Sequence, residues 1–141
     1  MSNFFPQNKK NSSDLIARLT SACEGLNYVS ETDAAVTPFS CDRSKGTTAD
    51  ALIAAAELPV DSHVEEVTSA SLFERLSLQR DWFGEKEKEN AKRFGELQEL
   101  LNGSLRDVTV YRIGQVQIHI FVVGLDPNGG LTGVRTFAVE T

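Results

Sequence analysis

The sequence predicts an α/β protein of the α+β type, a three-layer α-β-α sandwich around a mainly antiparallel sheet. Apolar residues recur at helical spacing in several segments of the first two thirds of the chain. The last third contains three β-like runs joined by short turns that contain glycine, which is typical of antiparallel hairpins. The middle run, Val116–Val123, carries apolar residues on both of its faces, so we expect helices to cover both sides of the sheet.

The chain of 141 residues is long enough for one domain with a proper core and too short for two. Residues 1–12 are polar, and we expect them to be a flexible tail before a single domain formed by residues 13–141. Ser12 or Ser13 is a suitable N-cap for a first helix that ends at Gly25. The apolar positions of this helix recur every three or four residues: Leu15, Ile16, Leu19, Ala22 and Cys23.

The stretch after Gly25 predicts short elements. Residues 26–30 alternate as a short strand does, and residues 34–48 are rich in turn-forming residues and predict a loop with one edge strand at its start. Thr47 or Thr48 begins a second helix, which closes before Pro59. Residues 63–68 form a further strand candidate.

Two more helices and three strands complete the prediction. The third helix starts at Ser69 or Ser71, and residues 80–84 break it. The fourth extends from Glu85 to Leu101, and the alternating charges at its start predict a solvated face. The final strands are Val108–Ile113, Val116–Val123 and Leu131–Glu140.

The last predicted strand continues almost to the final residue. We therefore expect the sheet to hold Glu140, Thr141 and the terminal carboxylate in a fixed place, although the ends of chains usually fray. Such a tip offers oxygen ligands and negative charge, which suit a metal ion or a basic cleft of a partner.

The formal net charge of -6 argues against direct nucleic-acid binding, because neutralising phosphates needs a surplus of Lys and Arg. It fits a protein that approaches a basic partner, although mild acidity also serves solubility. The first residues lack the apolar run of a secretory signal, and no window has the apolar length of a membrane span. We expect a soluble cytoplasmic protein with no membrane partner.

The inventory of catalytic residues is small. His63, His119, Cys23 and Cys41 are scattered, without the short paired spacings of a zinc site, and no phosphate-binding glycine loop occurs. We expect both cysteines to be free thiols, Cys23 buried and Cys41 in a polar loop. No nucleophile and base are paired, so we expect no enzyme and no cofactor.

Four other positions attract attention. Trp82, the single tryptophan, follows a helix break next to Arg80, and it is either a core residue or an anchor for a partner. Glu31, Glu140 and Thr141 are each ordinary when taken alone. Together with Trp82 they would form a rim that meets a positive, metal-bearing groove, but spacing alone does not show that they converge.

The Arg80-Asp81-Trp82-Phe83 segment, the helix after it and the run from Val110 to Thr141 resemble the nuclease A inhibitor family, as does the stretch from Gly25 to Glu31. These small acidic proteins block a sugar-non-specific DNA/RNA endonuclease that has a ββα-metal active site. The resemblance covers roughly residues 72–141 without gaps, and less fully the first helix through Glu31. The Val139-Glu140-Thr141 ending is its most specific element.

The resemblance implies an α-β-α sandwich similar to that of plant pathogenesis-related proteins, in a monomer that forms a one-to-one complex and occludes the nuclease active site. It implies that Glu31 pairs with a basic residue of the enzyme, and that Arg80 and Trp82 contact an acidic one. It also implies that Thr141, beside Glu140 as a further contact, reaches the catalytic metal of the partner.

Three departures from the family pattern keep an alternative open. The segment Ala34–Thr37 is longer than usual, residues 41–56 have no convincing match, and Arg80 stands where a neutral amide is typical. The alternative is a non-enzymatic interaction or adaptor domain with the same fold and a different partner.

Overall fold

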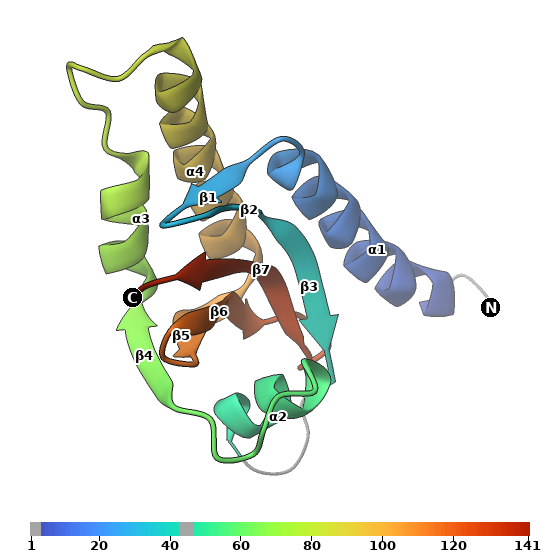
Figure 1. The fold of residues 1–141 in the computed structure, drawn as a ribbon. Coiled ribbons are helices and arrows are strands. Elements are labelled where there is room, and N and C mark those ends of the chain that lie inside the picture. Colours follow the sequence, from blue (N-terminus) through green and yellow to red (C-terminus); the bar gives the residue numbers. More distant parts are fainter. Residues whose placement is uncertain (1–3, 43–46) are drawn as a thin grey trace.

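The computed structural model describes residues 4–42 and 47–141 (Figure 1). Residues 1–3 of the predicted tail and residues 43–46 of the predicted loop lie outside the described residues. The elements follow in the order α1 (Phe4–Cys23), β1 (Asn27–Val29), β2 (Asp33–Ala35), β3 (Thr37–Cys41), α2 (Thr48–Ala55), β4 (Val64–Thr68), α3 (Ser69–Ser77), α4 (Glu85–Ser104), β5 (Arg106–Ile113), β6 (Gln117–Leu125) and β7 (Leu131–Val139).

The strands form a five-stranded sheet and a small hairpin. In the large sheet the order is β3-β7-β6-β5-β4, and every neighbouring pair is antiparallel. The strands β1 and β2 pair with each other as a separate two-stranded sheet. The predicted α+β class with a mainly antiparallel sheet is therefore confirmed.

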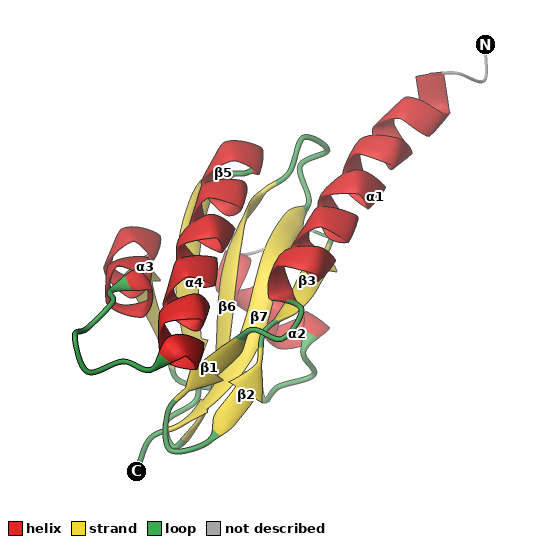
Figure 2. Cartoon of the chain, turned by 90° about the horizontal axis from the view of Figure 1, so that it is seen from above, coloured by secondary structure: helices red, strands yellow, loops and turns green. Residues whose placement is uncertain are grey.

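Helices cover both faces of the large sheet, as the two apolar faces of the middle strand predicted (Figure 2). On one face, residues of α1, α3 and α4 pack against Ile118, Ile120 and Val122 of β6. On the other face, Leu52 and Ile53 of α2 form a second cluster, which includes Phe39, Ile113, Phe121 and Val123. These two clusters make the layers of the predicted sandwich.

The turn between β6 and β7 is organised by one side chain. Asp126 Oδ1 accepts hydrogen bonds from the backbone N–H groups of Asn128 at 2.8 Å and Gly130 at 3.0 Å, and Asp126 Oδ2 accepts one from Thr132 Oγ1 at 2.8 Å. Gly129 has φ +84°, which glycine adopts without steric cost. The turn sets the register in which Leu125 pairs with Leu131 and Gln117 with Val139, and this register determines where the end of β7 lies.

Several predicted boundaries are wrong for local reasons. Helix α1 begins at Phe4 instead of at Ser12 or Ser13, and Pro6 is accommodated because the first turn of a helix needs no N–H donor from it. Two strands, β2 and β3, occupy the segment predicted to contain one, and Cys41 ends β3 instead of lying in a polar loop. Pro38 is tolerated because β3 is an edge strand.

The second helix begins where the sequence predicted. Thr47 is its N-cap, and the Thr47 and Asp50 side chains each accept a hydrogen bond from the other's backbone N–H, forming a capping box. No helix in the described part of the chain combines the length and the hydropathy needed to cross a bilayer.

Candidate functional site

The turn of the β1–β2 hairpin lies against the end of β7. The N–H of Val139 donates to Ser30 Oγ at 3.1 Å, and the carbonyl of Val139 accepts from the N–H of Glu31 at 3.3 Å. The turn is closed by the N–H of Ser30, which donates to the carbonyl of Thr32 at 2.9 Å. The small hairpin therefore extends the hydrogen bonding of β7 beyond the large sheet.

Glu31 binds Thr141 through both carboxylate oxygens. Its Oε2 accepts a hydrogen bond from the N–H of Thr141 at 2.6 Å, and its Oε1 accepts one from Thr141 Oγ1 at 2.8 Å. These hydrogen bonds, the backbone one first and the hydroxyl one second, lower the pKa of Glu31 from its ordinary value, against a small opposing effect of desolvation. Glu31 is therefore an exposed carboxylate that stays ionised at neutral pH.

Glu140 is held from the opposite side. Its N–H donates to the carbonyl of Val116 at 2.9 Å, and its Oε1 accepts from Arg112 Nη2 at 2.7 Å. Glu140 and Thr141 lie past the end of β7, where a chain usually frays. Here each of the two residues has both a backbone contact and a side-chain contact to the body of the protein.

Arg80 and Trp82 lie in the loop between α3 and α4. Trp82 is 77% exposed, so it is not a core residue, and its ring packs edge-on against Phe83 with centroids 4.9 Å apart. The N–H of Phe83 donates to the carbonyl of Arg80 at 3.0 Å, which closes a tight turn. Both residues are presented to solvent.

The predicted site residues form two separate groups. The loop between α3 and α4 lies at the far end of α3 from the C-terminal end of the chain (Figure 1). In the described part of the molecule, no contact joins Arg80 or Trp82 to Glu31, Glu140 or Thr141. We call Glu31, Glu140 and Thr141 the terminal group, and Arg80 and Trp82 the loop group.

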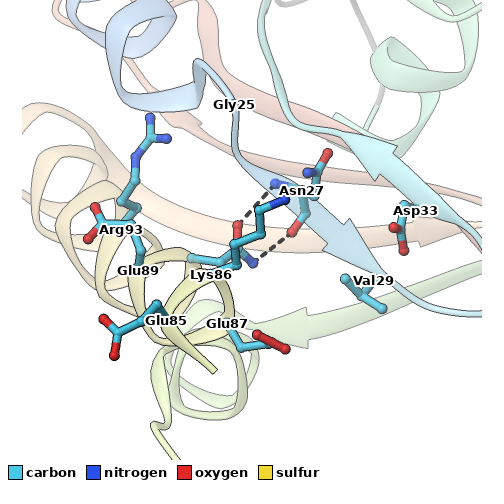
Figure 3. Close-up of a pocket in the computed structure, with 10 residues that line it drawn as sticks. Gly25, Asn27, Val29, Asp33, Glu85, Lys86, Glu87, Glu89 and Arg93 are labelled. Carbon is cyan, nitrogen blue, oxygen red and sulfur yellow. Dashed lines mark hydrogen bonds between the residues drawn. The ribbon is translucent and has the colours of Figure 1, made fainter. Parts of the chain in front are cut away.

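A groove of about 530 Å³ lies between the hairpin and the first turns of α4 (Figure 3). Asp33 and Val29 of the hairpin line one side, and Glu85, Glu87 and Glu89 of α4 line the other. The Asn90 side chain ties the two walls together, since it donates to the carbonyl of Asn27 at 3.0 Å and accepts from its N–H at 3.2 Å.

The two walls of the groove are close in the sequence to the two groups. One wall belongs to the hairpin that carries Glu31, and the other to the helix that follows Trp82. The sequence predicted the charged start of α4 as a solvated face, and these side chains are exposed. Sequence reasoning missed the groove itself, because its two walls are more than fifty residues apart in the chain and no local pattern signals their proximity.

Neither the histidines nor the cysteines form a further site. His119 packs edge-on against Phe137 at 5.1 Å, and burial, followed by the nearby Arg135, lowers the pKa of its imidazole. Both cysteines are free thiols. Burial raises the pKa of Cys23 to about 11, with partial opposition from Arg93, so the reactive thiolate is scarce at neutral pH. Within residues 4–42 and 47–141, no group of three or more His, Cys, Asp or Glu side chains could hold a metal ion.

A comparison with protein-family models gives a match over most of the chain. Residues 13–141 match the family model of NuiA, described as nuclease A inhibitor-like protein. A search of curated proteins finds no match. The matched residues include both groups and all the residues that line the groove.

Proposed function

Because the chain belongs to the nuclease A inhibitor-like family, we propose that it is a non-enzymatic protein that binds and occludes the active site of a non-specific, metal-dependent DNA/RNA endonuclease. It forms a one-to-one complex and needs no cofactor of its own. The observation that carries this proposal is the pairing of Glu31 with Thr141 at the exposed end of the sheet.

The terminal group is suited to entering an active site because it is ordered before binding. Hydrogen bonds to Glu31, Val116 and Arg112 already restrict Glu140 and Thr141, so less conformational entropy is lost when the complex forms. A flexible end would lose about 1–2 kcal/mol for each residue ordered. Preorganisation of this kind favours an inhibitor that works by filling a cleft.

Thr141 reaches the catalytic metal of the nuclease. A Mg²⁺ ion takes about six oxygen ligands and usually keeps several waters, one of which a hydroxyl oxygen can replace. Thr141 Oγ1 donates its proton to Glu31, so the lone pairs of the hydroxyl oxygen remain available for the metal. The negative charge of Glu31 also polarises this hydroxyl and makes its oxygen a better ligand.

Glu31 keeps the capacity to pair with a basic residue of the enzyme. Each of its oxygens accepts one hydrogen bond from Thr141, and a carboxylate oxygen has two lone pairs. The resemblance assigns such a basic partner to this position. Glu31 thus positions Thr141 and faces the enzyme at the same time.

The loop group is the second anchor of the complex. An exposed tryptophan next to an arginine is typical of residues that dominate the binding energy of interfaces. Arg80, where the family usually has a neutral amide, pairs more strongly with an acidic enzyme residue and disfavours a nuclease whose surface is basic there. This substitution bears on which nuclease the protein recognises.

Residues 41–56, which the sequence left without a convincing counterpart in the family, give the adaptor alternative little support. They lie within the residues 13–141 that match the family, and they include α2, which buries Leu52 and Ile53 against the second face of the sheet. This segment therefore contributes to the core, and its presence requires no additional partner.

The test is a titration of DNA cleavage by a ββα-metal endonuclease with the wild-type protein, a chain shortened by Glu140 and Thr141, and Trp82→Ala. Removing the terminal residues raises the inhibition constant by roughly 30-fold or more, the effect expected for an interface hot spot. Val60→Ser is the control, because Val60 is 93% exposed and belongs to neither group.

Equal inhibition by the shortened and the wild-type chains would remove the proposed role of Thr141. If the wild-type protein neither inhibits nor binds such a nuclease, the adaptor alternative replaces the proposed function.

A further inference from the structure

The guanidinium of Arg112 lies between two carboxylates. Its Nε is 3.3 Å from Glu65 Oε1, and its Nη2 is 2.7 Å from Glu140 Oε1. Glu65 lies directly opposite Arg112 in the pairing of β4 with β5, whereas Glu140 lies beyond the end of β7. One side chain therefore joins an edge strand of the sheet to the terminal group.

The sheet register shows how far the side chain of Arg112 extends. Arg112 pairs with Ile120 of β6, and Ile120 pairs in turn with Thr136 of β7. Because Glu140 lies four residues beyond Thr136, the Arg112 side chain extends across β6 and along the strands to reach it. Its side chain is only 17% exposed, which limits competition from water and strengthens the contact with Glu140.

We propose that Arg112 is a positioning residue of the inhibitor, which holds Glu140 and so sets the direction in which Thr141 leaves the sheet. This inference rests on the proposed function, because the direction matters only if Thr141 enters an active site. Glu31 restrains Thr141 from the hairpin side, and Arg112 restrains Glu140 from the β5 side. Without Arg112 the side chain of Glu140 loses this restraint. Glu140 then keeps only the hydrogen bond from its N–H to the carbonyl of Val116, and Thr141 keeps only its hydrogen bonds to the exposed Glu31.

The geometry calls for arginine at this position. Nη2 of the planar guanidinium donates a hydrogen bond to Glu140, while Nε of the same group lies within ion-pair distance of Glu65. A lysine ammonium is a compact charge on a flexible stem, and it does not reproduce a rigid fork of donors. Arg112→Lys therefore recovers only part of the restraint.

A purely structural role is the competing explanation. Opposite charges on neighbouring strands stabilise sheets, and the Glu65–Arg112 pair alone would do so. The two explanations differ in what they predict for Glu140 and Thr141, so the test measures these residues directly.

The first measurement is ¹⁵N relaxation of the Glu140 and Thr141 amides in the free protein. Order parameters fall from rigid values near ~0.85 toward ~0.6 in Arg112→Gln and in Glu140→Gln. Glu66→Gln is the matched control. It removes a negative charge, as Glu140→Gln does, at the position of β4 next to Glu65, and Glu66 takes part in neither of the described ion pairs. Unchanged order parameters in both Arg112→Gln and Glu140→Gln overturn the inference whatever the nuclease does.

The second measurement is the inhibition constant in a double-mutant cycle. Arg112→Gln raises the inhibition constant by about tenfold in the wild-type background. In a Glu140→Gln background the same substitution leaves the inhibition constant unchanged. An equal effect in both backgrounds means that Arg112 acts through general stability and overturns the inference. If the wild-type protein does not inhibit the nuclease, the proposed function is wrong. The role of Arg112 in inhibition is then wrong as well, even if the order parameters show that Arg112 restrains the terminal group.

Discussion

At the scale of single residues, the properties of Glu31 come from its two donors. The sequence identifies an acid at the end of a short strand, and such a residue is ordinarily a solvated charge. The structure adds the N–H and the hydroxyl of Thr141, which both donate to this carboxylate. These bonds stabilise the ionised form, so the pKa of Glu31 lies below its value in the unfolded chain.

The direction of the pKa shift sets a pH dependence. A carboxylate whose pKa is lowered by folding contributes its stabilising contacts above the unfolded pKa, and these contacts are lost as the pH falls through the folded pKa. Glu31 therefore holds Thr141 throughout the neutral range and releases it in acid.

Thr141→Val is expected to raise the pKa of Glu31 toward its ordinary value, because the hydroxyl donor is lost. The recovery is partial, since the backbone N–H of Thr141 still donates. An NMR titration of the Glu31 side-chain carboxyl carbon measures the shift. Thr136→Val is the control, because its hydroxyl donates to the carbonyl of Ala35. The same Glu31 pKa in wild type and Thr141→Val would contradict the pairing.

At the scale of elements, β7 connects the core to the site. It is an interior strand that pairs with β3 on one side and β6 on the other, and it presents Val139 to the hairpin. Its neighbours approach closely at Gly133, where an added Cβ would lie 1.8 Å from the carbonyl oxygen of Val122. Close backbone approach is a common reason for glycine within a strand.

Gly133→Ala is expected to lower the free energy of unfolding by about 1–3 kcal/mol, because the backbone of β6 or β7 must shift to admit the methyl group. Gly103→Ala near the end of α4 is the matched control, since no atom lies within 4 Å of its added Cβ. Alanine there stabilises the helix by up to about 1 kcal/mol. Urea unfolding followed by circular dichroism compares the two, and equal stability of both variants would refute the packing argument.

At the scale of the whole molecule, the acidic character of the chain extends to the groove. The net charge is -6, and the groove between the hairpin and α4 is lined by four carboxylates and two cations. One of the cations, Arg93, already donates to the carbonyls of Ser21 and Ala22. A basic nuclease surface would be attracted to this face from a distance.

The association rate constant with a nuclease is expected to fall by roughly tenfold or more between about 0.05 and 0.5 M salt, because salt screens long-range attraction. Stopped-flow fluorescence measures it, and the dissociation rate changes much less. Glu31→Gln flattens the dependence, whereas Val60→Ser leaves it unchanged. A wild-type rate constant that is insensitive to salt would refute electrostatic steering.

Most of the fold was predictable because its signals are local. Helical spacing identified α2, α3 and α4, and the apolar residues on both faces of β6 predicted helices on both sides of the sheet. Predictions were wrong where local signals compete. Ser12 and Ser13 are good caps but lie inside α1, and the polar, turn-rich segment around Pro38 concealed β3, which the pairing with β7 stabilises.

The sequence by itself determined the type and order of nearly every element, and it pointed to Glu31, Arg80, Trp82, Glu140 and Thr141 through a family resemblance. Only the tertiary structure decided which of these residues meet. Glu31 and Thr141 are 110 positions apart and Arg112 and Glu140 are 28 apart, yet both pairs are in contact, while Trp82 lies elsewhere. Such contacts depend on the order of strands in the sheet, and periodicity along a chain carries no information about that order.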